Sequence, residues 1–526
     1  MSYVEHKTTN KKPLVGEAAL SNLVKDSLQD YQLVVVSNRE PYIHRYLKDE
    51  IVAFQPAGGL VSAIDPLLKI CDGTWVAWGS GEADPAVVDE KSRVRVPPAH
   101  PSYTLRRVWL SENLINNYYY GFSNRALWPL CHNVYIQPTF DEEDWTYYCH
   151  ANDLFAKAAI EEIQNDKQNL VFANDYQLAL VPQSLRQEQP DILMGHFWHI
   201  PWPPWEIFRA LPWKAEIIES LLSLDLFGLQ TQNDVFNFLR TVHKEFEDES
   251  SVDFERQKVF CDDHTLTVKA FPISIDYEYI AKYVQGDKLG STVEGLKQEY
   301  GQNIILSVDR LDYTKGLRHR LKGINRFFAE NPQYRGRAAF VMIVSPSRIQ
   351  IDEYNTLEEE LTRNIRVLNQ RLGSDIWTPI VYLNQRYDQK DLFAFYRAAD
   401  VVAVTSIQDG MNLVCKEAIA ANAGDQIVLI LSEFAGAADE VQTALTYNPF
   451  NLNRFVESIK QALEMTAQER MQRFHAMSDV VQYNNIFKWT LDIFETILKI
   501  GRDKKERFKV DLKQQKPRES STLNNE

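Results

Sequence analysis

Cysteine is scarce in this chain, with five in 526 residues. They are scattered at Cys71, Cys131, Cys149, Cys261 and Cys415, and no two of them form a CxxC pair. An odd number of separated cysteines argues against a disulfide framework and against a cysteine-based zinc site. We therefore expect a reducing compartment and a cytoplasmic protein.

Long apolar runs are also missing. No run approaches the ~20 residues that span a bilayer, and the first residues, MSYVEHKTTNKK, contain no apolar signal segment.

Basic residues are outnumbered, with 57 Lys and Arg against 72 Asp and Glu, so the net charge is −15. This balance excludes a general nucleic-acid coat or an anionic-membrane binder as an expected function, but it leaves room for a basic pocket that takes a small phosphate ligand. We expect neither nucleic acid nor membrane as a partner.

The rest of the composition, 44% hydrophobic and 25% charged, is ordinary for a globular protein. Short β-branched runs alternate with helical patterns, which is typical of βαβ units in a parallel sheet. The pattern restarts after a polar stretch near residues 285–290. We predict an α/β chain with two doubly wound parallel-sheet domains, residues 29–275 and 276–483, and a ligand cleft at the carboxyl ends of the strands. The predicted buried strands include 32–37, 74–78, 105–109, 170–173, 192–198 and 226–229, then 304–308, 339–344, 380–383, 401–404 and 427–431.

The two ends of the chain have a different character. Residues 1–28 and 503–526 are polar and show no apolar period, so we predict a disordered N-terminal arm and a disordered tail. The last long helical region, near residues 480–499, could pack on either domain.

Two polar features favour a structural interpretation. The acidic run from Asp141 to Asp144 precedes a predicted helix and is typical of N-terminal capping. His196 and His199 have an HxxH spacing, but no third ligand follows in a suitable context, so we predict no metal site.

Glycines precede the first apolar helix, at Gly58 and Gly59. Paired glycines at a helix start let a phosphate approach the backbone amides, although the same pattern often marks only a tight turn. The GxGxxG fingerprint is absent from this position, which weakens an NAD-binding interpretation.

Two loops of the second domain hold the strongest candidates for ligand binding. Arg310 and Lys315 lie on one strand-to-helix loop and could both contact a diphosphate, the alternative being a solvated surface loop. Asp409 and the residues after it follow another buried strand and lead into a helix near Leu413, either as a ligand-binding turn or simply as a capped helix start. Glu417, one turn into that helix, could accept hydrogen bonds from ribose hydroxyls.

Polar groups also follow two strands of the first domain. Asn174-Asp175-Tyr176 ends one strand, and His199-Ile200-Pro201 ends the next. The segment from Asn117 to Trp128 is dense in aromatic residues, a composition more typical of core packing than of a binding site.

Taken together, these segments resemble the trehalose-6-phosphate synthases, the retaining sugar-nucleotide transferases of glycosyltransferase family 20. The resemblance runs from about Leu33 to about Asn484. It rests on the ordered motifs SNR, AGGL, WVAW, YYYGFSNRALWP, NDYQLALVP, HIPWPPWEIF, GLQTQND, RLDYTKGL, PSR, NQR, DGMNLVCKE and LSEFAGAA.

The resemblance implies a GT-B architecture, in which two Rossmann-like domains face a cleft. Residues 29–275 would form the acceptor domain, 276–483 the nucleotide-sugar donor domain, and 484–502 a helix that crosses back to the first domain. The implied catalytic residues are Arg310, Lys315, Asp409 and His199. The implied donor-binding residues are Gly59, Arg310, Lys315, Asp409, Gly410, Met411, Asn412, Leu413 and Glu417. The implied acceptor-binding residues are Arg39, Trp78, Tyr119, Trp128, Asp175 and Arg348, of which Arg39, Tyr119, Trp128 and Arg348 would hold the 6-phosphate.

The implied reaction moves glucose from a nucleotide-glucose, UDP-glucose in our prediction, to glucose 6-phosphate. It needs no protein nucleophile, no metal and no other cofactor, because Arg310 and Lys315 neutralise the leaving diphosphate. The sequence alone does not fix whether the base is uracil, adenine or guanine, nor the oligomeric state, so a homo-oligomer stays open. No phosphatase domain is expected after residue ~500, so a separate phosphatase should act on the product.

Two alternatives remain. A glucosylglycerol-phosphate synthase would use glycerol 3-phosphate, but that sister group lacks AGGL and an arginine at the position of Arg348. A catalytically silent regulatory subunit would have lost donor-site residues, which are present here. One departure from the family is Asn174-Asp175-Tyr176-Gln177, where many members have His-Asp-Tyr-His. It leaves the fine contacts to the acceptor open.

Overall fold

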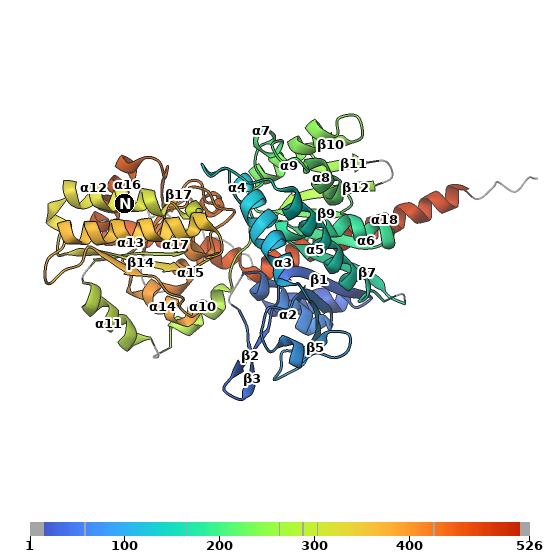
Figure 1. Ribbon diagram of the computed structural model, residues 1–526, viewed down its shortest axis with the longest axis horizontal. Helices are drawn as coiled ribbons and strands as arrows, with labels where there is room; N and C mark the ends of the chain where they lie inside the picture. The colour runs from blue at the N-terminus through green and yellow to red at the C-terminus, as the bar shows by residue number, and fades with distance from the viewer. Residues whose placement is uncertain are drawn as a thin grey trace, which may run out of the picture.

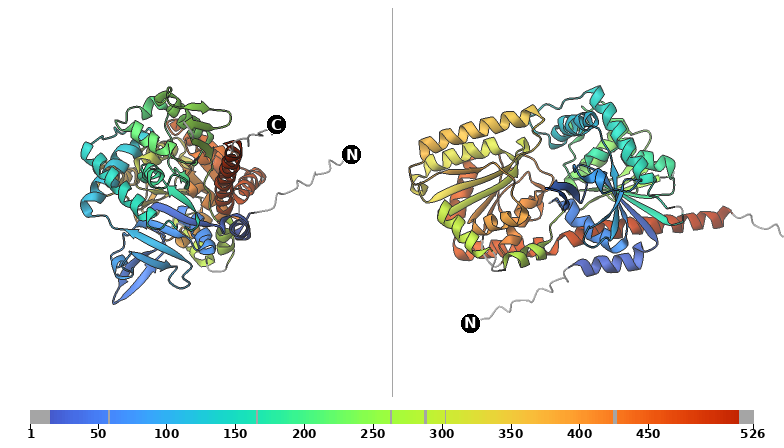
Figure 2. Two further views of the ribbon diagram at one scale, coloured as in Figure 1. Left: turned by 90° about the vertical axis from the view of Figure 1, so that its right-hand side faces the viewer. Right: turned by 60° about the horizontal axis from the view of Figure 1, so that its bottom comes forward.

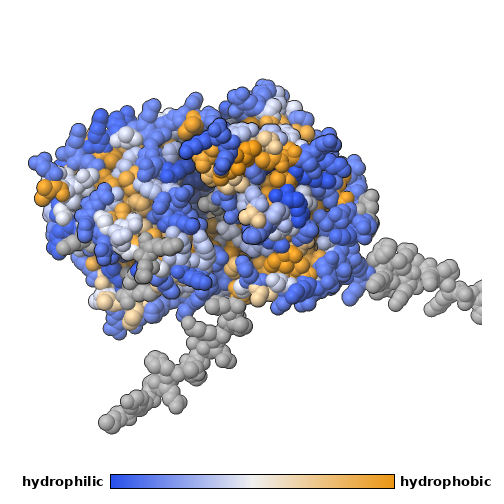
Figure 3. Space-filling view, turned by 90° about the horizontal axis from the view of Figure 1, so that it is seen from below, coloured by the Kyte–Doolittle hydropathy of each residue, from blue (hydrophilic) through white to orange (hydrophobic). Residues whose placement is uncertain are grey.

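The computed structural model describes residues 15–56, 59–164, 166–261, 264–286, 289–301, 303–423 and 427–515. Two α/β domains lie side by side, and the last long helix runs from one to the other (Figure 1). Seen from below, a hollow separates the two domains (Figure 3). The predicted fold class, with a mainly parallel sheet in each domain, is confirmed.

The N-terminal domain is built on a ten-stranded sheet of order β10-β11-β12-β9-β8-β7-β1-β4-β6-β5. Its central strands pair in parallel, and antiparallel pairs close both edges. The central strands are almost wholly buried because helices cover both faces, which accounts for their continuous apolar sequences. The strands are β1 (Tyr31–Arg39), β4 (Thr74–Trp78), β5 (Arg93–Val96), β6 (Tyr103–Val108), β7 (Gln168–Asn174), β8 (Leu193–Phe197), β9 (Leu226–Leu229), β10 (Ser251–Asp253), β11 (Lys258–Cys261) and β12 (His264–Ala270).

Helices pack around this sheet. The main ones are α2 (Gly59–Cys71), α4 (Trp128–His132), α5 (Glu142–Ile160), α6 (Val181–Glu188), α8 (Lys214–Leu222) and α9 (Gln232–Glu245), with a wide-turned π-type segment η3 (Ile115–Leu127) before α4. Asp141 caps α5 by accepting hydrogen bonds from the amides of Glu143 and Asp144, so the predicted capping role of the acidic run is confirmed. A hairpin of β2 (Ile43–Leu47) and β3 (Glu50–Phe54) projects from the domain (Figure 1).

The C-terminal domain has a six-stranded sheet of order β15-β14-β13-β16-β17-β18, in which every pairing is parallel. The strands are β13 (Asn303–Arg310), β14 (Ala338–Ser345), β15 (Ile380–Leu383), β16 (Val401–Val404), β17 (Val428–Ser432) and β18 (Leu445–Tyr447). The helices around them are α10 (Tyr277–Val284), α11 (Gly290–Tyr300), α12 (Leu317–Glu330), α13 (Asp352–Leu372), α14 (Gln389–Ala398), α15 (Leu413–Ala421), α16 (Leu452–Glu464) and α17 (Ala467–Tyr483).

Helix α18 (Ile486–Gln515) returns from the C-terminal domain to the N-terminal one. The Trp489 indole donates to the Phe271 carbonyl at 2.9 Å, and the Thr490 hydroxyl donates to the Ala63 carbonyl at 3.0 Å. Further along, the Phe494 ring lies 5.3 Å from that of Phe172. These contacts attach the end of the chain to the first domain.

The structure contradicts the predicted disordered ends in part. Helix α1 (Glu17–Leu23) continues as a π-type turn to Leu28 and packs beside α18 (Figure 2, right). Leu20, Leu23, Val24 and Leu28 are buried, because their spacing forms one apolar helix face. At the other end α18 stays helical to Gln515. The predicted arm over residues 1–14 and the tail over 516–526 lie outside the described residues. In the described part of the chain, no helix is both long enough and apolar enough to cross a membrane.

Candidate active site

The predicted site residues follow the carboxyl ends of parallel strands in both sheets, as doubly wound folds require. They come from both domains and meet between them. On the N-terminal side they follow β1, β4, β7 and β8, and on the C-terminal side β13, β14 and β16.

Lys315 and Asp409 form a buried ion pair at the base of the C-terminal side. The Lys315 ammonium lies 2.6 Å from Asp409 Oδ2, which also accepts hydrogen bonds from Ser406 Oγ and Asn412 Nδ2, both at 3.1 Å. Burial would raise the pKa of Asp409, but Lys315 outweighs it and lowers the pKa to about 2. Gly316 closes the turn at φ +67°, where a Cβ would lie 2.1 Å from the Thr405 carbonyl oxygen. The loop therefore holds the Lys315 ammonium in one position against Asp409.

The loop after Asp409 meets the other domain. A Cβ on Gly410 would lie 2.5 Å from the His199 carbonyl oxygen, so only glycine permits this approach. Asn412 adopts φ +79° and its side chain accepts a hydrogen bond from the Cys415 amide, so this residue caps α15, as one of the two alternatives for the segment required. Met411 is buried beside it. The segment Gly410–Leu413 is thus held between the start of α15 and the other domain.

Gly59 and Glu417 are both placed by α15, Gly59 against its first residue and Glu417 within it. A Cβ on Gly59 would lie 2.7 Å from Leu413 Cδ1, so the start of α2 touches the start of α15. Gly58, the other member of the predicted glycine pair, lies outside the described residues. Glu417 accepts hydrogen bonds from the Tyr396 hydroxyl at 3.1 Å and from Gln389 Nε2 at 3.4 Å. Burial raises its pKa.

Arg348 crosses from the C-terminal domain to the aromatic segment of the N-terminal one. Its guanidinium carbon lies 4.0 Å from the centre of the Trp128 ring, a cation–π contact. One terminal nitrogen donates to Asp312 Oδ2 at 3.2 Å and to the Tyr354 hydroxyl at 2.5 Å, and the other donates to the Tyr176 hydroxyl at 3.4 Å. The side chain is therefore rigidly held between the domains.

Tyr119 lies among three arginines. Burial would raise its pKa, but Arg39 and Arg348, with Arg310, outweigh burial and lower the pKa to about 8. Arg310 also lies 5.5 Å from the centre of the Trp128 ring. The three cations converge, and they do not each have a neighbouring carboxylate. Such a group suits a dianion such as a phosphate monoester. The Trp78 ring lies 6.4 Å from that of Tyr119, so it belongs to the same group.

Asp175 holds the loop of His199. It adopts φ +74°, and its Oδ1 accepts hydrogen bonds from the amides of Tyr176 at 3.0 Å and His199 at 3.1 Å. His199 Nε2 and Trp128 Nε1 are buried and have no hydrogen-bond partner among the described residues. Unpaired buried polar atoms are rare in native proteins, and two of them at one cleft indicate positions that a polar ligand would satisfy.

The structure thus brings the sixteen predicted site residues to two adjoining groups, one around Lys315 and Asp409 and one around Trp128 and Arg348. Three further residues had been given no role: Asp312 and Tyr354, which hold the guanidinium of Arg348, and His132, whose ring lies 4.1 Å from that of Trp128. Asp312 stands in the quoted RLDYTKGL motif, whereas nothing in the sequence around Tyr354 or His132 indicates their contacts.

Two other predictions can be placed. Asn174 is fully buried, and its Nδ2 donates to the carbonyls of Val36 and Phe172 within the sheet. His196 is also buried, and its Nε2 contacts the Asp175 carbonyl at 3.1 Å. Within the described ranges, no group of three or more His, Cys, Asp or Glu side chains is arranged to hold a metal ion.

Comparison with known proteins decides the family. Residues 31–499 match the sequence profile of glycosyltransferase family 20. The trehalose-6-phosphate synthase of Mycobacterium marinum is 36% identical over 478 residues, which cover 89% of this chain and 94% of that protein. The chain belongs to glycosyltransferase family 20. It is therefore a glycosyltransferase of the trehalose-6-phosphate synthase type, as the motifs indicated.

Solved structures of family 20 members agree. An E. coli structure described as bound with UDP-2-fluoro glucose is 32% identical and has a TM-score of 0.79, and the match covers 89% of this chain and 99% of that one. An α,α-trehalose-phosphate synthase (UDP-forming) from Burkholderia xenovorans, in complex with glucose-6-phosphate, is 30% identical with a TM-score of 0.78, covering 89% and 100%. The expected GT-B architecture of this family 20 enzyme is thereby confirmed.

Proposed function

We propose that this family 20 enzyme transfers glucose from UDP-glucose to glucose 6-phosphate and forms α,α-trehalose 6-phosphate and UDP. The observation that carries the proposal is the group of cations around Tyr119 and Trp128, built by both domains next to the Lys315–Asp409 pair. One cationic group suits the acceptor phosphate and the adjoining one suits the donor diphosphate.

The acceptor phosphate fits the first group. Arg39 and Arg348 flank the Tyr119 hydroxyl, and Trp128 forms an aromatic wall under the guanidinium of Arg348. A guanidinium fork binds a phosphate in a bidentate manner, which orients the sugar as well as holding its charge. Support also comes from the Burkholderia xenovorans structure, a complex with glucose-6-phosphate.

The donor fits the second group. Lys315 and Arg310 would contact the diphosphate, Glu417 the ribose hydroxyls, and the loop from Asp409 to Asn412 the glucose. Asp409 keeps Lys315 in place and is itself ionised at neutral pH, because its pKa is about 2. The choice of uracil rests on relatives described as UDP-forming or as bound with a UDP-sugar.

The chemical step follows from these positions. The bond between the anomeric carbon and the β-phosphate oxygen breaks, and Arg310 and Lys315 neutralise the charge that grows on the leaving UDP. The acceptor hydroxyl attacks from the same face and passes its proton to the departing phosphate oxygen, so the configuration is retained. Placing both sugars in one closed cleft supplies a further part of the acceleration. In this proposal the two cations perform the role that a divalent metal has in other transferases, and no cofactor takes part.

Nucleotide release by the purified protein tests the proposal. UDP-, ADP- and GDP-glucose are each combined with glucose 6-phosphate and, separately, with glycerol 3-phosphate, without added metal. We expect UDP release that depends on glucose 6-phosphate. Release only with glycerol 3-phosphate would reassign the protein to the sister activity, and absence of release from a folded protein that binds nucleotide would indicate a regulatory role.

A further inference from the structure

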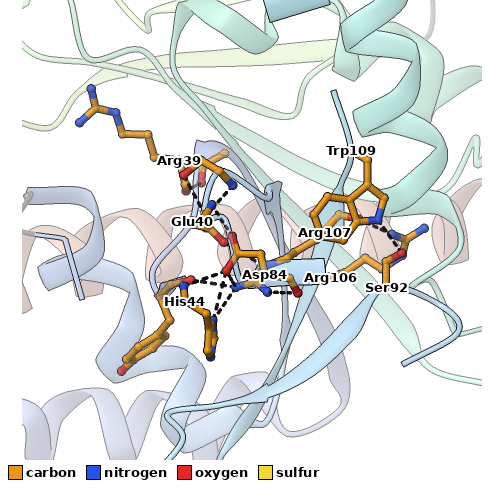
Figure 4. Close-up of polar contacts among 12 residues, drawn as sticks. Arg39, Glu40, His44, Asp84, Ser92, Arg106, Arg107 and Trp109 are labelled. Carbon is orange, nitrogen blue, oxygen red and sulfur yellow. Dashed lines mark hydrogen bonds and ion pairs between the residues drawn. The ribbon is translucent and has the colours of Figure 1, made fainter. Parts of the chain in front are cut away.

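Four ionisable side chains lie buried together behind the acceptor side of the cleft (Figure 4). Glu40, Asp84 and Arg107 are at most 1% exposed, and His44 is buried beside them. Glu40 directly follows β1, His44 lies on β2, Asp84 lies in the segment after β4, and Arg107 lies on β6. None of them belongs to the proposed binding groups.

Arg107 joins the segments of this cluster. Its Nε donates to Glu40 Oε2 at 2.9 Å, its Nη1 to the Asp84 carbonyl at 3.1 Å, and its Nη2 to the Tyr42 carbonyl at 3.1 Å. Nη2 also lies 2.7 Å from Asp84 Oδ1 and 2.9 Å from His44 Nδ1. One guanidinium therefore holds residues 40–44 and the segment after β4 against β6.

The two carboxylates hold the backbone of the same segments. Glu40 Oε1 accepts hydrogen bonds from the Ser80 amide at 2.8 Å and its hydroxyl at 3.0 Å. Asp84 accepts from the amides of His44 at 2.8 Å and Gly81 at 2.7 Å. A Cβ on Gly81 would lie 2.4 Å from the His44 carbonyl oxygen, so the two segments touch at the backbone.

These segments begin at two acceptor residues. Glu40 follows Arg39, and Ser80 comes two residues after Trp78. Figure 4 shows Glu40 inside the cluster while the side chain of its neighbour Arg39 points away from it. The register of β1 against β4 shifts between Ser37 and Arg39, and after the shift Arg39 pairs with Trp78, so the two acceptor residues end their strands side by side where the cluster begins. Among the described strands, the β2–β3 hairpin pairs with no others, so the cluster is one of its main attachments.

The geometry points to Arg107, Glu40 and Asp84 as positioning residues for the acceptor. They fix the positions in which Arg39 and Trp78 meet a phosphorylated sugar. This inference rests on the proposed function. A buried ion cluster is not an efficient source of stability, since apolar side chains of similar size often serve as well. Its directional bonds, in contrast, fix two irregular segments in one arrangement. Displacement of a substrate-positioning group by about 1 Å can cost up to about 100-fold in rate, so such a cluster has a measurable consequence.

The test is Glu40→Gln in the full-length enzyme. The substitution keeps the size of the side chain but turns one acceptor into a donor, so the bond to Arg107 or the pair of bonds to Ser80 is lost. We expect the KM for glucose 6-phosphate to rise about tenfold, with kcat and the KM for UDP-glucose changed by about twofold at most. Arg107→Lys, which keeps the charge but not the fork, should give the same selective change, and Arg107→Met a larger one.

The matched control is Asp225→Asn, which removes a buried carboxylate of the same domain. Asp225 pairs with Arg186 at 3.1 Å and accepts from the Met194 amide at 2.8 Å, at the start of β9 and away from the cleft. It should lower the thermal midpoint without altering either KM. An unchanged acceptor KM in Glu40→Gln, or equal losses for both substrates as in a merely unstable protein, would overturn the inference. Calorimetric titration of the wild type with glucose 6-phosphate separates the two proposals: if the wild type does not bind it, the proposed function fails, and this inference fails with it.

Discussion

Replacing Arg348 by lysine measures how much the guanidinium, which contacts both domains, contributes to acceptor binding. The charge is kept, but the contacts of the fork with Asp312, Tyr354 and Tyr176 and the stacking on Trp128 at 4.0 Å are lost or weakened. An alanine would leave Asp312 buried without its main partner, which mixes a folding defect into the result. Lysine is therefore the cleaner substitution.

The magnitude follows from the contacts. A hydrogen bond to a charged group contributes about 1.5–3 kcal/mol and a buried cation–π contact up to about 2 kcal/mol, of which a lysine retains part. A net loss of about 2–3 kcal/mol in acceptor binding corresponds to a factor of about 30–150. We expect the KM for glucose 6-phosphate to rise by this factor, while the KM for the donor changes little, because Lys315 and Asp409 are untouched.

The assay is initial-rate UDP release with each substrate varied at saturating concentrations of the other. The control is Arg318→Lys, the same exchange at a partly exposed arginine that pairs with Glu360 at 2.7 Å, which should alter neither constant since surface exchanges are worth about 0.5 kcal/mol or less. An acceptor KM for Arg348→Lys equal to that of the control would refute the role of the fork.

Four further results are expected. Asp409→Asn should lower kcat about 100-fold or more, as for loss of a group that supports charge stabilisation; retained turnover would contradict the assignment. The KM for glucose 6-phosphate should rise above about pH 8, because Tyr119, with a pKa of about 8, becomes an anion there and repels the phosphate dianion; Tyr119→Phe should flatten that part of the profile. Dialysis against EDTA should leave the rate unchanged, and a loss restored by a divalent cation would disprove metal-independent transfer. Leu20→Ala should lower stability by about 2–5 kcal/mol, measured by chemical unfolding, without changing either KM, because Leu20 is buried where α1 packs on α18 and belongs to neither proposed binding group.

The strands and long helices could be predicted because their apolar patterns are strong. The predicted strand 304–308 appears as Asn303–Arg310, and the predicted strand 380–383 appears as Ile380–Leu383. Helix α1 could not be predicted in this way. It is short, and its apolar face is buried only when it packs against α18, more than 450 residues away in the chain. The composition of residues 1–28 is polar on average, so the four apolar residues of that face do not stand out.

The proposed ligand-binding residues could be named from motifs, whereas the residues that hold them in place could not. Lys315 and Asp409 stand in recognisable segments, and their pairing follows from two neighbouring strand ends. The bond of Arg348 to Tyr354, and that of Arg107 to Glu40, depend on side-chain directions in the folded state. No spacing in the sequence encodes them.

Backbone conformation connects these two classes of residue. Asp175, Arg348 and Asn412 adopt φ values of +74°, +50° and +79°, which non-glycine residues rarely take. Each such residue costs on the order of 1–3 kcal/mol and persists only where surrounding contacts compensate. Here the contacts are identifiable: Asp175 accepts two amide hydrogen bonds, Asn412 caps α15, and the guanidinium of Arg348 has three oxygen partners. At these three positions the contacts of the side chain offset the strain of its own backbone, so the residues that shape the cleft also hold its irregular loops in place.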